Sequence, residues 1–481
     1  MNRRSFIKTS LAASALPLFN IGCQATRPRI CGKGRRLRVA LVGCGGRGVN
    51  IAMTDMVKEE IVAFADPNPW RIEAAFARLR QLDPTADTSK IKVFRDYRDL
   101  FDQAADEIDA AIITTQNSQH ALAALMAMRK GIHVFVEKPL ALTVEEVKVL
   151  HAAAKRYGVV TQVGHHGHST AGIRLAAEYM AAGAFGEVRD VYCWCDRVNS
   201  RLSRPPKATP PAGMDWDAWC GGSPICDWYD ADGLFPALTW HDWHNWIDYG
   251  NGSIGNMGSH IIDTPVFMLG LDKTPPVSVE AKEVVWGAQG AWPLRSRVDL
   301  TFPARGKMSP VTLHWYDGVK NGVSLDAAHL EGFGLIQNHA DQYLPPEVEE
   351  MEAKYCTKPG VNFGRLGTMI VTDRGVVTFG GWGAPPRFWP DKLRKEMPKP
   401  PQLFERIKTS HQAEFYAAIR EGRKASTDFD YGAPLAEMIL LANAAQRAGC
   451  KRLDWNGLQF TDDAQANTYL TKSYRKGWNV A

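Results

Sequence analysis

The sequence lacks several features that would assign the chain to a special class of protein. Its nine cysteines do not form two CxxC pairs, which argues against a zinc site, and no metal site is expected. Charge of neither sign predominates, because 57 basic residues stand against 52 acidic ones and the two kinds are mixed along the chain. The net charge of +5 therefore gives no reason to expect nucleic-acid binding. The chain also has no internal repeat and no apolar run long enough for a mature transmembrane helix.

What is present fits a globular protein with a full core, since 45% of the residues are hydrophobic and 23% are charged. Fifteen tryptophans stand out. Indole faces pack well against the C–H faces of sugar rings, so their number favours a carbohydrate ligand. For any single tryptophan, a place in the core or between domains explains its presence equally well.

The N-terminal residues predict an export signal that is separate from the fold. Arg3-Arg4 match a twin-arginine pattern, and the apolar stretch 11–21 that follows is too short to span a bilayer. Gly22-Cys23 resembles a lipoprotein processing site, although Asn20 stands where leucine is usual. We expect a periplasmic or outer-surface protein, with Cys23 as a candidate lipid anchor.

Apolar runs and helical stretches alternate over residues 36–165. This βαβ alternation predicts a doubly wound, parallel sheet of the Rossmann type. The strand-like runs are 37–42, 61–65, 92–94, 110–113, 133–136 and 159–163.

After residue 187 the pattern changes to strands without intervening helices. We expect an α+β domain over 166–450 with a large, mainly antiparallel open sheet, which makes the whole chain an α/β protein. Helices are expected at 410–421 and 432–448, where they can pack back against the first domain. Residues 1–35 are then signal and linker, and 451–481 form a C-terminal tail. The expected strands of the second sheet are 188–194, 277–286, 296–302, 310–315 and a hairpin within 369–379.

Residues 43–48 match GxGxxG directly after a strand and at the start of a helix, which is the context that gives this weak pattern its meaning. Gly43 permits the tight turn, Gly45 lets the backbone approach a pyrophosphate, and Gly48 lets helix and strand pack closely. Phosphates would then bind the free N–H groups at the helix N-terminus. The other members of this candidate cofactor loop are Cys44, Gly46 and Arg47.

Asp66 supplies the second half of a dinucleotide site. It ends the next strand, 18 residues after Gly48, where a carboxylate can accept hydrogen bonds from both ribose hydroxyls. The same carboxylate would repel a 2′-phosphate, so NAD is favoured over NADP, although Arg47 leaves room for NADP. Because the twin-arginine route carries folded proteins, we expect the cofactor to be tightly bound.

Three further segments resemble motifs of the glucose–fructose oxidoreductase / inositol dehydrogenase (Gfo/Idh/MocA) family. Thr115–His120 looks like its strand-end loop, Glu137-Lys138-Pro139 matches its EKP motif, and 251–263 looks like its glycine-rich substrate motif. The C-terminal stretch from Thr372 resembles exported, twin-arginine members. The resemblance covers roughly residues 36–477. It implies a sugar oxidoreductase that uses NAD(P) and forms homo-oligomers through its C-terminal sheet.

By this resemblance Lys138 and His260 are the catalytic pair. Oxidation of a sugar carbinol removes a hydride from carbon and a proton from oxygen, and His260 has an ordinary pKa suited to a base. Lys138 can stabilise negative charge that develops on the substrate oxygen. Asn256 departs from the family's usual Asp one helical turn before the histidine. An amide cannot ionise, so Asn256 is expected to orient the substrate. His260 is then the sole base, or another group serves with it.

The remaining candidate contacts follow from the same segments. In residues 240–246, indole rings alternate with polar side chains, an arrangement that suits a sugar. Packing of these aromatic residues between the two domains would explain the pattern equally well. Three close histidines at 165–168 lack an accompanying carboxylate or thiol at ligand spacing, so they are expected to line the cleft without a metal. The expected cofactor contacts are Thr115, Asn117, His120, Glu137, Lys138 and His166, and the expected substrate contacts are His165, Trp240, His241, Trp243 and Asp263.

Three functions remain open at this stage. The first is NAD(P)-dependent oxidation or reduction of a sugar or glycoside carbinol. The second is redox-neutral glycoside hydrolysis, in which NAD acts transiently through oxidation, elimination, hydration and re-reduction. The third is a non-catalytic, sugar-binding surface lipoprotein, which Asn256 supports best.

Overall fold

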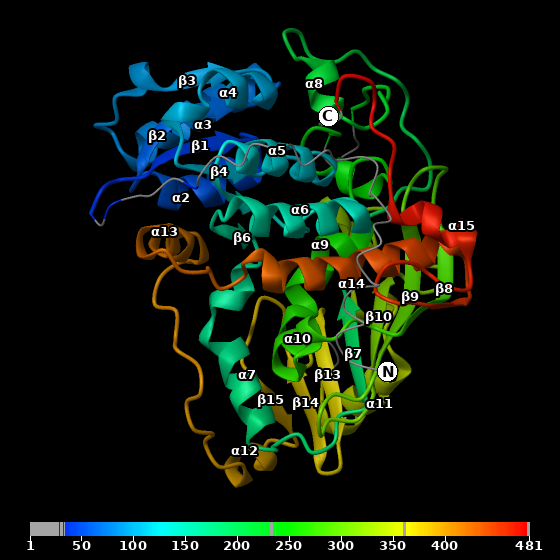
Figure 1. Ribbon diagram of the computed structural model, residues 1–481. Helices are drawn as coiled ribbons and strands as arrows, with labels where there is room; N and C mark the ends of the chain where they lie inside the picture. The colour runs from blue at the N-terminus through cyan, green and yellow to red at the C-terminus, as the bar shows by residue number, and fades with distance from the viewer. Residues whose placement is uncertain are drawn as a thin grey trace, which may run out of the picture.

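The computed structural model describes residues 34–230, 234–235, 237–358 and 362–478, together with residues 28 and 32. The predicted twin-arginine signal and Cys23 lie outside these residues. The N-terminal part forms a parallel sheet of six strands in the order β3-β2-β1-β4-β5-β6 (Figure 1). The predicted doubly wound Rossmann-type sheet is thereby confirmed. Its strands are β1 (Arg38–Val42), β2 (Glu60–Ala65), β3 (Lys92–Phe94), β4 (Ala110–Ile113), β5 (His133–Val136) and β6 (Thr161–Val163).

The helices between these strands begin and end at residues that suit helix ends. The Thr143 hydroxyl and the Glu146 carboxylate form a reciprocal capping box at the start of α6, and Gly158 ends that helix with a φ of +63°. The helix after β1 differs from a regular one, because it opens with a π-helical turn, Gly48–Ala52, before α2 (Met53–Met56). The other helices are α3 (Pro69–Leu82), α4 (Tyr97–Gln103), α5 (Asn117–Arg129) and α6 (Val144–Tyr157).

The second sheet has eight strands in the order β15-β14-β13-β7-β10-β9-β8-β16. All neighbours are antiparallel except β7 and β10, so the mainly antiparallel sheet predicted for the second domain is confirmed. Its strands are β7 (Asp190–Cys195), β8 (Ser278–Trp286), β9 (Pro293–Phe302), β10 (Val311–Gly318), β13 (Gly367–Thr372), β14 (Gly375–Phe379), β15 (Arg387–Trp389) and β16 (Arg452–Asp454).

The two faces of this sheet are covered differently. Successive side chains of a strand point to opposite faces, and in β7 Cys193 and Cys195 belong to the large central core while Trp194 belongs to a separate cluster. Helices α9 (Gly252–Ile261), α10 (Asp263–Leu269) and α14 (Phe429–Ala448) cover the central side. On the other side Val348 of α11 (Pro346–Tyr355) packs in the cluster of Trp194.

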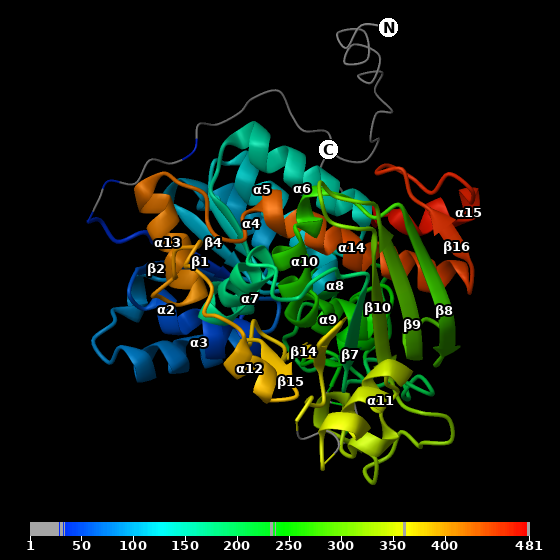
Figure 2. The same cartoon turned by 90° about the horizontal axis from the view of Figure 1, so that it is seen from below.

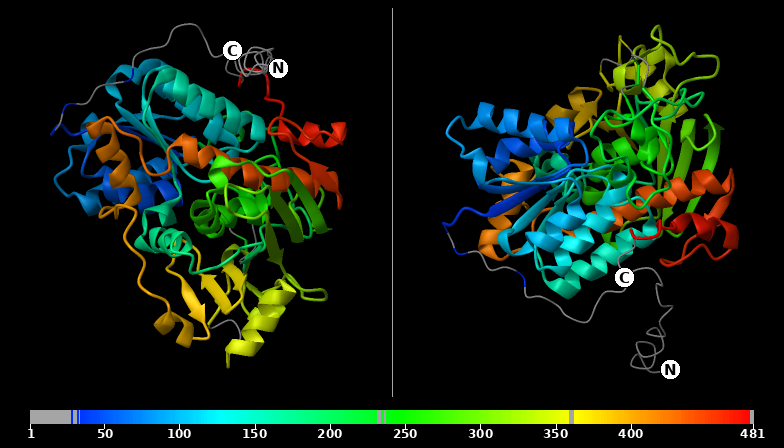
Figure 3. Two further views of the ribbon diagram at one scale, coloured as in Figure 1. Left: turned by 60° about the horizontal axis from the view of Figure 1, so that its bottom comes forward. Right: turned by 90° about the horizontal axis from the view of Figure 1, so that it is seen from above.

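The C-terminal helices join the two sheets. Figure 3 shows α14 running between the helices of the first domain and the second sheet, and it contacts α6 as well as α9, β8 and β9. Helix α13 (His411–Glu421) lies beside the first sheet (Figure 2), where Phe415 and Ile419 share a core cluster with Phe64 and Phe135. Because this packing buries apolar surface between the two parts, it fixes their relative position.

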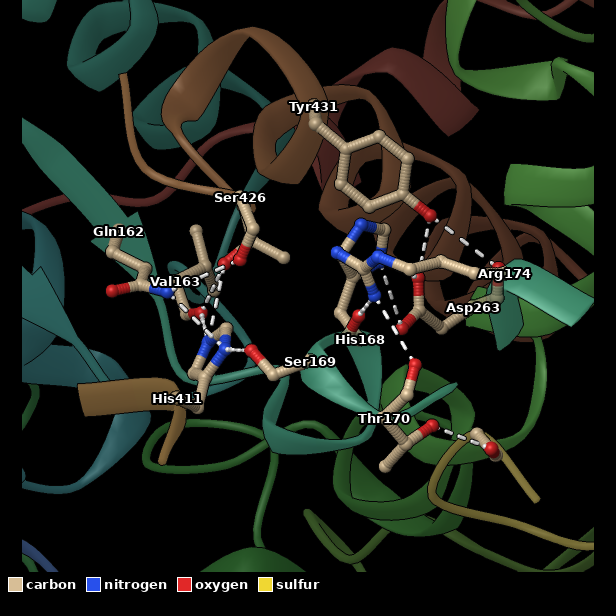
Figure 4. A network of polar contacts seen from close by, with 12 residues as sticks. Gln162, Val163, His168, Ser169, Thr170, Arg174, Asp263, His411, Ser426 and Tyr431 are labelled. Carbon is tan, nitrogen blue, oxygen red and sulfur yellow. Dashed lines mark hydrogen bonds and ion pairs between the residues drawn. The ribbon is translucent and has the colours of Figure 1, made fainter. Parts of the chain in front are cut away.

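A buried polar network ties the segment after β6 to these helices (Figure 4). His168 contacts the Asp263 carboxylate (Nδ1 to Oδ1, 3.0 Å), which also accepts a hydrogen bond from the Tyr431 hydroxyl (2.5 Å). Ser169 and His411 are joined through Oγ and Nδ1 (2.6 Å), and His411 contacts the Val163 carbonyl through Nε2 (2.8 Å). The end of β6 is thus held to α10, α13 and α14.

The chain differs from the sequence-based expectations in several places. The segment predicted as a tail contributes β16 to the second sheet, and Trp478 reaches the first domain, where the Arg98 guanidinium lies 3.5 Å from its ring centre. Several helices were not anticipated, among them α7 (Ala171–Ala181) and α11. Among the described helices, none combines the length and the apolar character that a membrane crossing requires.

Candidate active site

Two glycines shape the turn after β1. Gly43 has a φ of +89°, and its N–H donates to the Ala65 carbonyl (2.8 Å). A Cβ at Gly43 would lie 2.8 Å from the Thr114 carbonyl carbon, and one at Gly48 would lie 2.7 Å from Thr114 Oγ1, so neither position admits a side chain. At Gly45, by contrast, nothing lies within 4 Å of the place of a Cβ. The turn is closed against β4 and open over Gly45, where a phosphate can approach the backbone.

Asp66 lies at the end of β2, beside this turn. Its carboxylate accepts hydrogen bonds from the N–H groups of Cys44 (2.7 Å) and Asn68 (2.8 Å). Burial raises the pKa of Asp66 to about 6, so the group is mainly ionised at neutral pH. A carboxylate has about four acceptor positions, and two protein donors therefore leave room for ribose hydroxyls.

Two adjoining cavities meet at this turn. The first, here called the turn cavity, is lined by Gly43, Gly45, Asp66 and Trp219 among others. The second, here called the lysine cavity, is lined by residues of both domains. The two share Gly46, Arg47, Thr114, Thr115, Trp240 and Trp243 in their walls. The residues that only the lysine cavity contains are Asn50, Asn117, His120, Glu137, Lys138, Arg197, His241, His244, Asn256, Met257, His260, Phe333 and Trp382.

The start of α5 presents polar atoms toward the lysine cavity. Asn117 lines the cavity, and its side-chain Nδ2 and Oδ1 are buried with no partner in the described part of the chain. Unpaired buried amide atoms are costly, so they indicate a ligand that completes them. Both ring nitrogens of His120 contact backbone carbonyls, those of Pro139 (2.8 Å) and Thr115 (3.0 Å). His120 therefore holds the Thr115 loop against the segment that carries Lys138.

Lys138 follows β5 and reaches Asn256 on α9 of the other domain. Its Nζ donates to both the backbone oxygen (2.6 Å) and Oδ1 (2.9 Å) of Asn256. Burial lowers the pKa of Lys138 to about 7, and the neighbouring Arg47 and Arg197 act in the same direction. Lys138 thus titrates near neutral pH and can exchange protons with a substrate.

Asn256 is itself held by a chain of amides. Its Nδ2 donates to Oδ1 of Asn199 (3.0 Å), and Nδ2 of Asn199 contacts Oδ1 of Asn245 (3.5 Å). Asn245 in turn donates to Asp242 (2.7 Å), which also accepts from Arg201 (2.7 Å). These contacts fix the orientation of the Asn256 amide, so its oxygen, which carries no proton, faces Lys138.

His260 lies one helical turn beyond Asn256 and lines the same cavity. Burial lowers its pKa well below the ordinary value, with Lys138 and Arg47 adding to the effect, so His260 is neutral. Its Nδ1 is buried without a partner in the described chain. The Trp382 ring lies 5.2 Å from the His260 ring, centre to centre. The backbone N–H of Trp382 donates to the backbone carbonyl of His260 (2.7 Å).

Glu137 is buried next to Lys138 and contacts two other predicted site residues. Its Oε1 accepts from Arg47 Nε (2.9 Å) and contacts His166 Nε2 (2.9 Å). Burial alone would raise its pKa, but the charges of Arg47 and His166 hold the pKa of Glu137 well below the usual range. Glu137 therefore acts as a fixed anion that positions the glycine turn against the segment after β6.

The other predicted contacts occupy different places. Trp240, His241 and Trp243 line the lysine cavity, and burial lowers the pKa of His241 to about 3. His165 and Asp263 are not among the residues that line either cavity. Both ring nitrogens of His165 are buried without a partner in the described chain, and burial lowers its pKa to about 4. The Asp263 carboxylate is engaged in the network of Figure 4, so its contact with substrate stays a prediction.

The lysine cavity contains several residues that sequence analysis missed, among them Arg197, Phe333 and Trp382. Phe333 and Trp382 are the two non-glycine residues with positive φ in the described chain, at 68° and 58°. Each stands between two glycines, in Gly332-Phe333-Gly334 and Gly381-Trp382-Gly383. An aromatic residue flanked in this way is a pattern that could have marked both positions.

The fold and site define a two-domain protein with a dinucleotide turn and a polar cavity at the junction. Family models agree with this class. The "Oxidoreductase family, NAD-binding Rossmann fold" model of GFO_IDH_MocA matches residues 37–165, and the "Oxidoreductase family, C-terminal alpha/beta domain" model matches residues 191–303. The chain belongs to the Gfo/Idh/MocA oxidoreductase family.

Individual relatives are distant or cover little of the chain. A 1,5-anhydro-D-fructose reductase of Ensifer adhaerens is 38% identical over 80 residues, which span 17% of this chain and 24% of the relative. A glycosyl hydrolase family 109 protein of Shewanella pealeana is 31% identical over 174 residues, spanning 32% and 37%. The structure of a levoglucosan dehydrogenase in complex with NADH and levoglucosan aligns over 87% of this chain and 99% of that one, with a TM-score of 0.52 and 18% identity. The chain thus spans well under half of the curated relatives it matches, and the solved structure supports the fold alone.

The residues present fit NAD. Gly45 leaves its backbone open, Asp66 offers a carboxylate at the strand end, and Asn117 keeps both side-chain polar atoms unpaired in the described chain. The open turn suits a pyrophosphate, the carboxylate suits ribose hydroxyls, and a buried amide suits a polar head group.

Proposed function

We propose that this protein is an NAD-dependent oxidoreductase that acts on a carbinol of a sugar or glycoside. One observation carries the proposal: Lys138 of the first domain and Asn256 and His260 of the second line a single cavity that continues into the glycine turn. Four aromatic side chains, Trp240, Trp243, Phe333 and Trp382, border the same space and suit the apolar faces of a sugar ring.

Lys138 is the candidate base. When it is neutral, its two N–H groups are taken by the two oxygens of Asn256, and its lone pair is free to accept the proton of a substrate hydroxyl. With a pKa of about 7, about half of the lysine has this form at pH 7. When bound, NAD supplies the acceptor for the hydride, which leaves the carbon that bears this hydroxyl.

His260 has a supporting part in this scheme. As a neutral imidazole beside Lys138 it can exchange hydrogen bonds with a second hydroxyl of the sugar without adding charge. Asn256 leaves the pKa of Lys138 low, because its amide oxygens accept hydrogen bonds from Lys138 but carry no negative charge that would favour the protonated amine. In this proposal Lys138 transfers the proton, and Asn256 and His260 orient the substrate.

The carboxylate of Asp66 supports NAD over NADP. A 2′-phosphate would place two further negative charges beside a buried anion, and Arg71 and Arg95 lie close enough to lower the pKa of Asp66 only partly. The tight binding expected of the cofactor is part of this proposal.

The proposal is tested with the purified, full chain. Mass spectrometry of the native protein identifies any bound nucleotide, and absorbance of reduced nicotinamide follows turnover with a panel of sugars. We expect NAD-linked oxidation of at least one sugar and a loss of about 100- to 10,000-fold in Lys138→Met. Lys148→Met is the matched control, since Lys148 is a partly buried lysine of the same domain outside both cavities. Equal losses in both variants, or no reduction with any sugar, would refute the proposal.

Redox-neutral glycoside hydrolysis is the second candidate. The similarity to a glycosyl hydrolase family 109 protein supports it. Aryl glycosides incubated without added NAD distinguish the two functions, because release of the aglycone without net change in nicotinamide absorbance is expected only for the hydrolase.

Export by the twin-arginine route to the periplasm or outer surface, with lipid attached at Cys23, also belongs to this proposal, and the sequence at 3–23 supports it. Association of copies through the second sheet is proposed as well. The exposed Val285 and Trp286 at the end of β8 support that surface. Cell fractionation with a Cys23→Ala variant and sedimentation of the mature protein test these two points.

A further inference from the structure

Arg197 is a cation of the lysine cavity that the proposed chemistry does not use. It follows β7, and its backbone is fixed by two contacts: the hydroxyl of Ser253 donates to the Arg197 carbonyl (3.1 Å), and Arg197 forms a β-bridge with Leu335. The next residue, Val198, donates to the Gly334 carbonyl (2.8 Å). Arg197 is therefore held beside the loop that carries Phe333.

The guanidinium of Arg197 has no hydrogen-bond or ion-pair partner in the described part of the chain, and its Nε is buried. The nearest acid in sequence, Asp196, does not line the cavity, and its carboxylate lies 3.7 Å from Arg365 Nε. Burial raises the pKa of Asp196, and the charges of Arg197 and Arg365 both act to lower it, but Asp196 forms no hydrogen bond or ion pair with Arg197 in the described chain. The buried Nε–H of Arg197 lacks an acceptor in the described chain, and because the residue lines the cavity its guanidinium can offer further N–H donors to a ligand there. Such a residue indicates an anion that the chain itself does not supply.

The charged residues around the cavity are mostly positive. Its lining contains three cations, Arg47, Lys138 and Arg197, and one carboxylate, Glu137, which already contacts Arg47 and His166. The charge of Arg197 also helps to lower the pKa of Lys138, after burial and Arg47. The cavity lining therefore has an excess of positive charge close to the candidate base.

Arg197 stands apart from the dinucleotide phosphates. It comes from the second domain and does not line the turn cavity, where Gly43 and Gly45 offer their backbone to a pyrophosphate. Its anion is therefore expected on the substrate. Phe333, in the loop next to Arg197, contacts His241 edge to face at 4.8 Å between ring centres.

We propose that Arg197 binds a carboxylate of the substrate, so that the sugar is a uronic acid or a uronoside. The planar guanidinium matches a carboxylate in a two-point contact. The inference rests on the proposed function for the reaction but concerns the class of sugar.

The test compares methyl uronosides with the matching methyl hexosides in the gluco, galacto and manno series. Binding to the NAD-loaded protein is followed by quenching of tryptophan fluorescence, and turnover by nicotinamide absorbance. For at least one pair we expect the uronoside to bind on the order of 10- to 100-fold more tightly than the hexoside. In Arg197→Gln this ratio should fall toward one, and Arg197→Lys should restore part of it.

Arg365→Gln is the matched control, because it removes the same charge near Asp196 but outside the cavity. We expect it to keep the preference for the acid. Thermal midpoints and NAD affinity of each variant show that it is folded.

The outcomes separate the two proposals. Preference for hexosides in every pair, equal weakening of both sugars in Arg197→Gln, or no binding of any uronoside overturns the inference. If hexosides are oxidised with NAD and uronosides are not, only the inference fails. If uronosides bind through Arg197 but no nicotinamide is reduced, the inference stands and the proposed oxidoreductase function fails.

Discussion

Asn256→Asp tests whether the uncharged amide is what keeps Lys138 weakly basic. In the structure Nζ of Lys138 lies 2.9 Å from Oδ1 of Asn256, so the substitution places a carboxylate oxygen in direct contact with the amine. The shape of the side chain is retained, and only its charge changes. Any effect on rate therefore reports electrostatics rather than packing.

The size of the effect follows from this short distance. An opposite charge within about 4–6 Å moves a pKa by roughly one to three pH units toward the charged form. From a Lys138 pKa of about 7, the neutral fraction at pH 7 then falls from about one half to between about 10% and 0.1%. We expect the rate at pH 7 to fall by about 5- to 500-fold.

The assay is the pH dependence of kcat/KM for hydride transfer between pH 6 and 10. The rate of the variant should recover at alkaline pH, because deprotonation is delayed rather than abolished. Asn256→Ala serves as the control: it removes the Oδ1 acceptor without adding charge, so its profile should keep its midpoint near that of the native protein. A loss in Asn256→Asp that is the same at every pH would refute the assignment of Lys138 as the titrating base.

Three other predictions concern the cofactor site. Gly48→Ala should abolish NAD binding in a fluorescence titration, since the added Cβ would lie 2.7 Å from Thr114 Oγ1 and against the Gly43 carbonyl; unchanged affinity would show that the turn is not the phosphate site. NAD affinity should fall about tenfold per pH unit below pH 6, because Asp66 has a pKa of about 6 and binds the ribose hydroxyls as the anion. In Asp66→Asn, the NAD affinity measured by calorimetry should not show this pH dependence. Glu137→Gln should lower the free energy of unfolding at pH 7 by roughly 1–3 kcal/mol, since Arg47 keeps partial access to solvent. Because the pKa of Glu137 is depressed in the folded protein, the stabilisation from its charge is present above pH 4.5 and is lost as the pH falls through the pKa of the folded state. Chemical denaturation should therefore give a smaller difference in unfolding free energy between Glu137→Gln and the native protein in acid than at pH 7.

Much of the fold was predictable because its signals are local. The strand at 37–42, the glycine turn and the helices at 410–421 and 432–448 each follow from residues that are neighbours in sequence. The π-helical turn at Gly48–Ala52 was not predictable, because the sequence there suits an α-helix. The start of helix α5 at Asn117 is not marked in the sequence, since Gln116 makes no side-chain cap there.

The site was less predictable because its contacts cross the chain. The pairing of Lys138 with Asn256 joins residues 118 positions apart, and only the family motifs suggested that the two segments meet. Arg197 escaped notice because a single arginine after a strand looks like any solvated cation. Its distinction is the lack of a partner within the described fold, and that is a property of the folded arrangement alone.

The position of α14 limits how a nucleotide enters and leaves. This helix contacts α6 on one side and α9 on the other, so the two domains cannot swing apart without exposing its buried residues. Access must instead come from the loop that carries Trp240 and Trp243, whose indoles border both cavities, and Arg71 of the first domain lies 4.4 Å from the Trp240 ring centre. On this arrangement, exchange of nucleotide requires this loop to lift away from Arg71, and we expect dissociation to be slow. The proposed enzyme would then keep the same nucleotide through many turnovers.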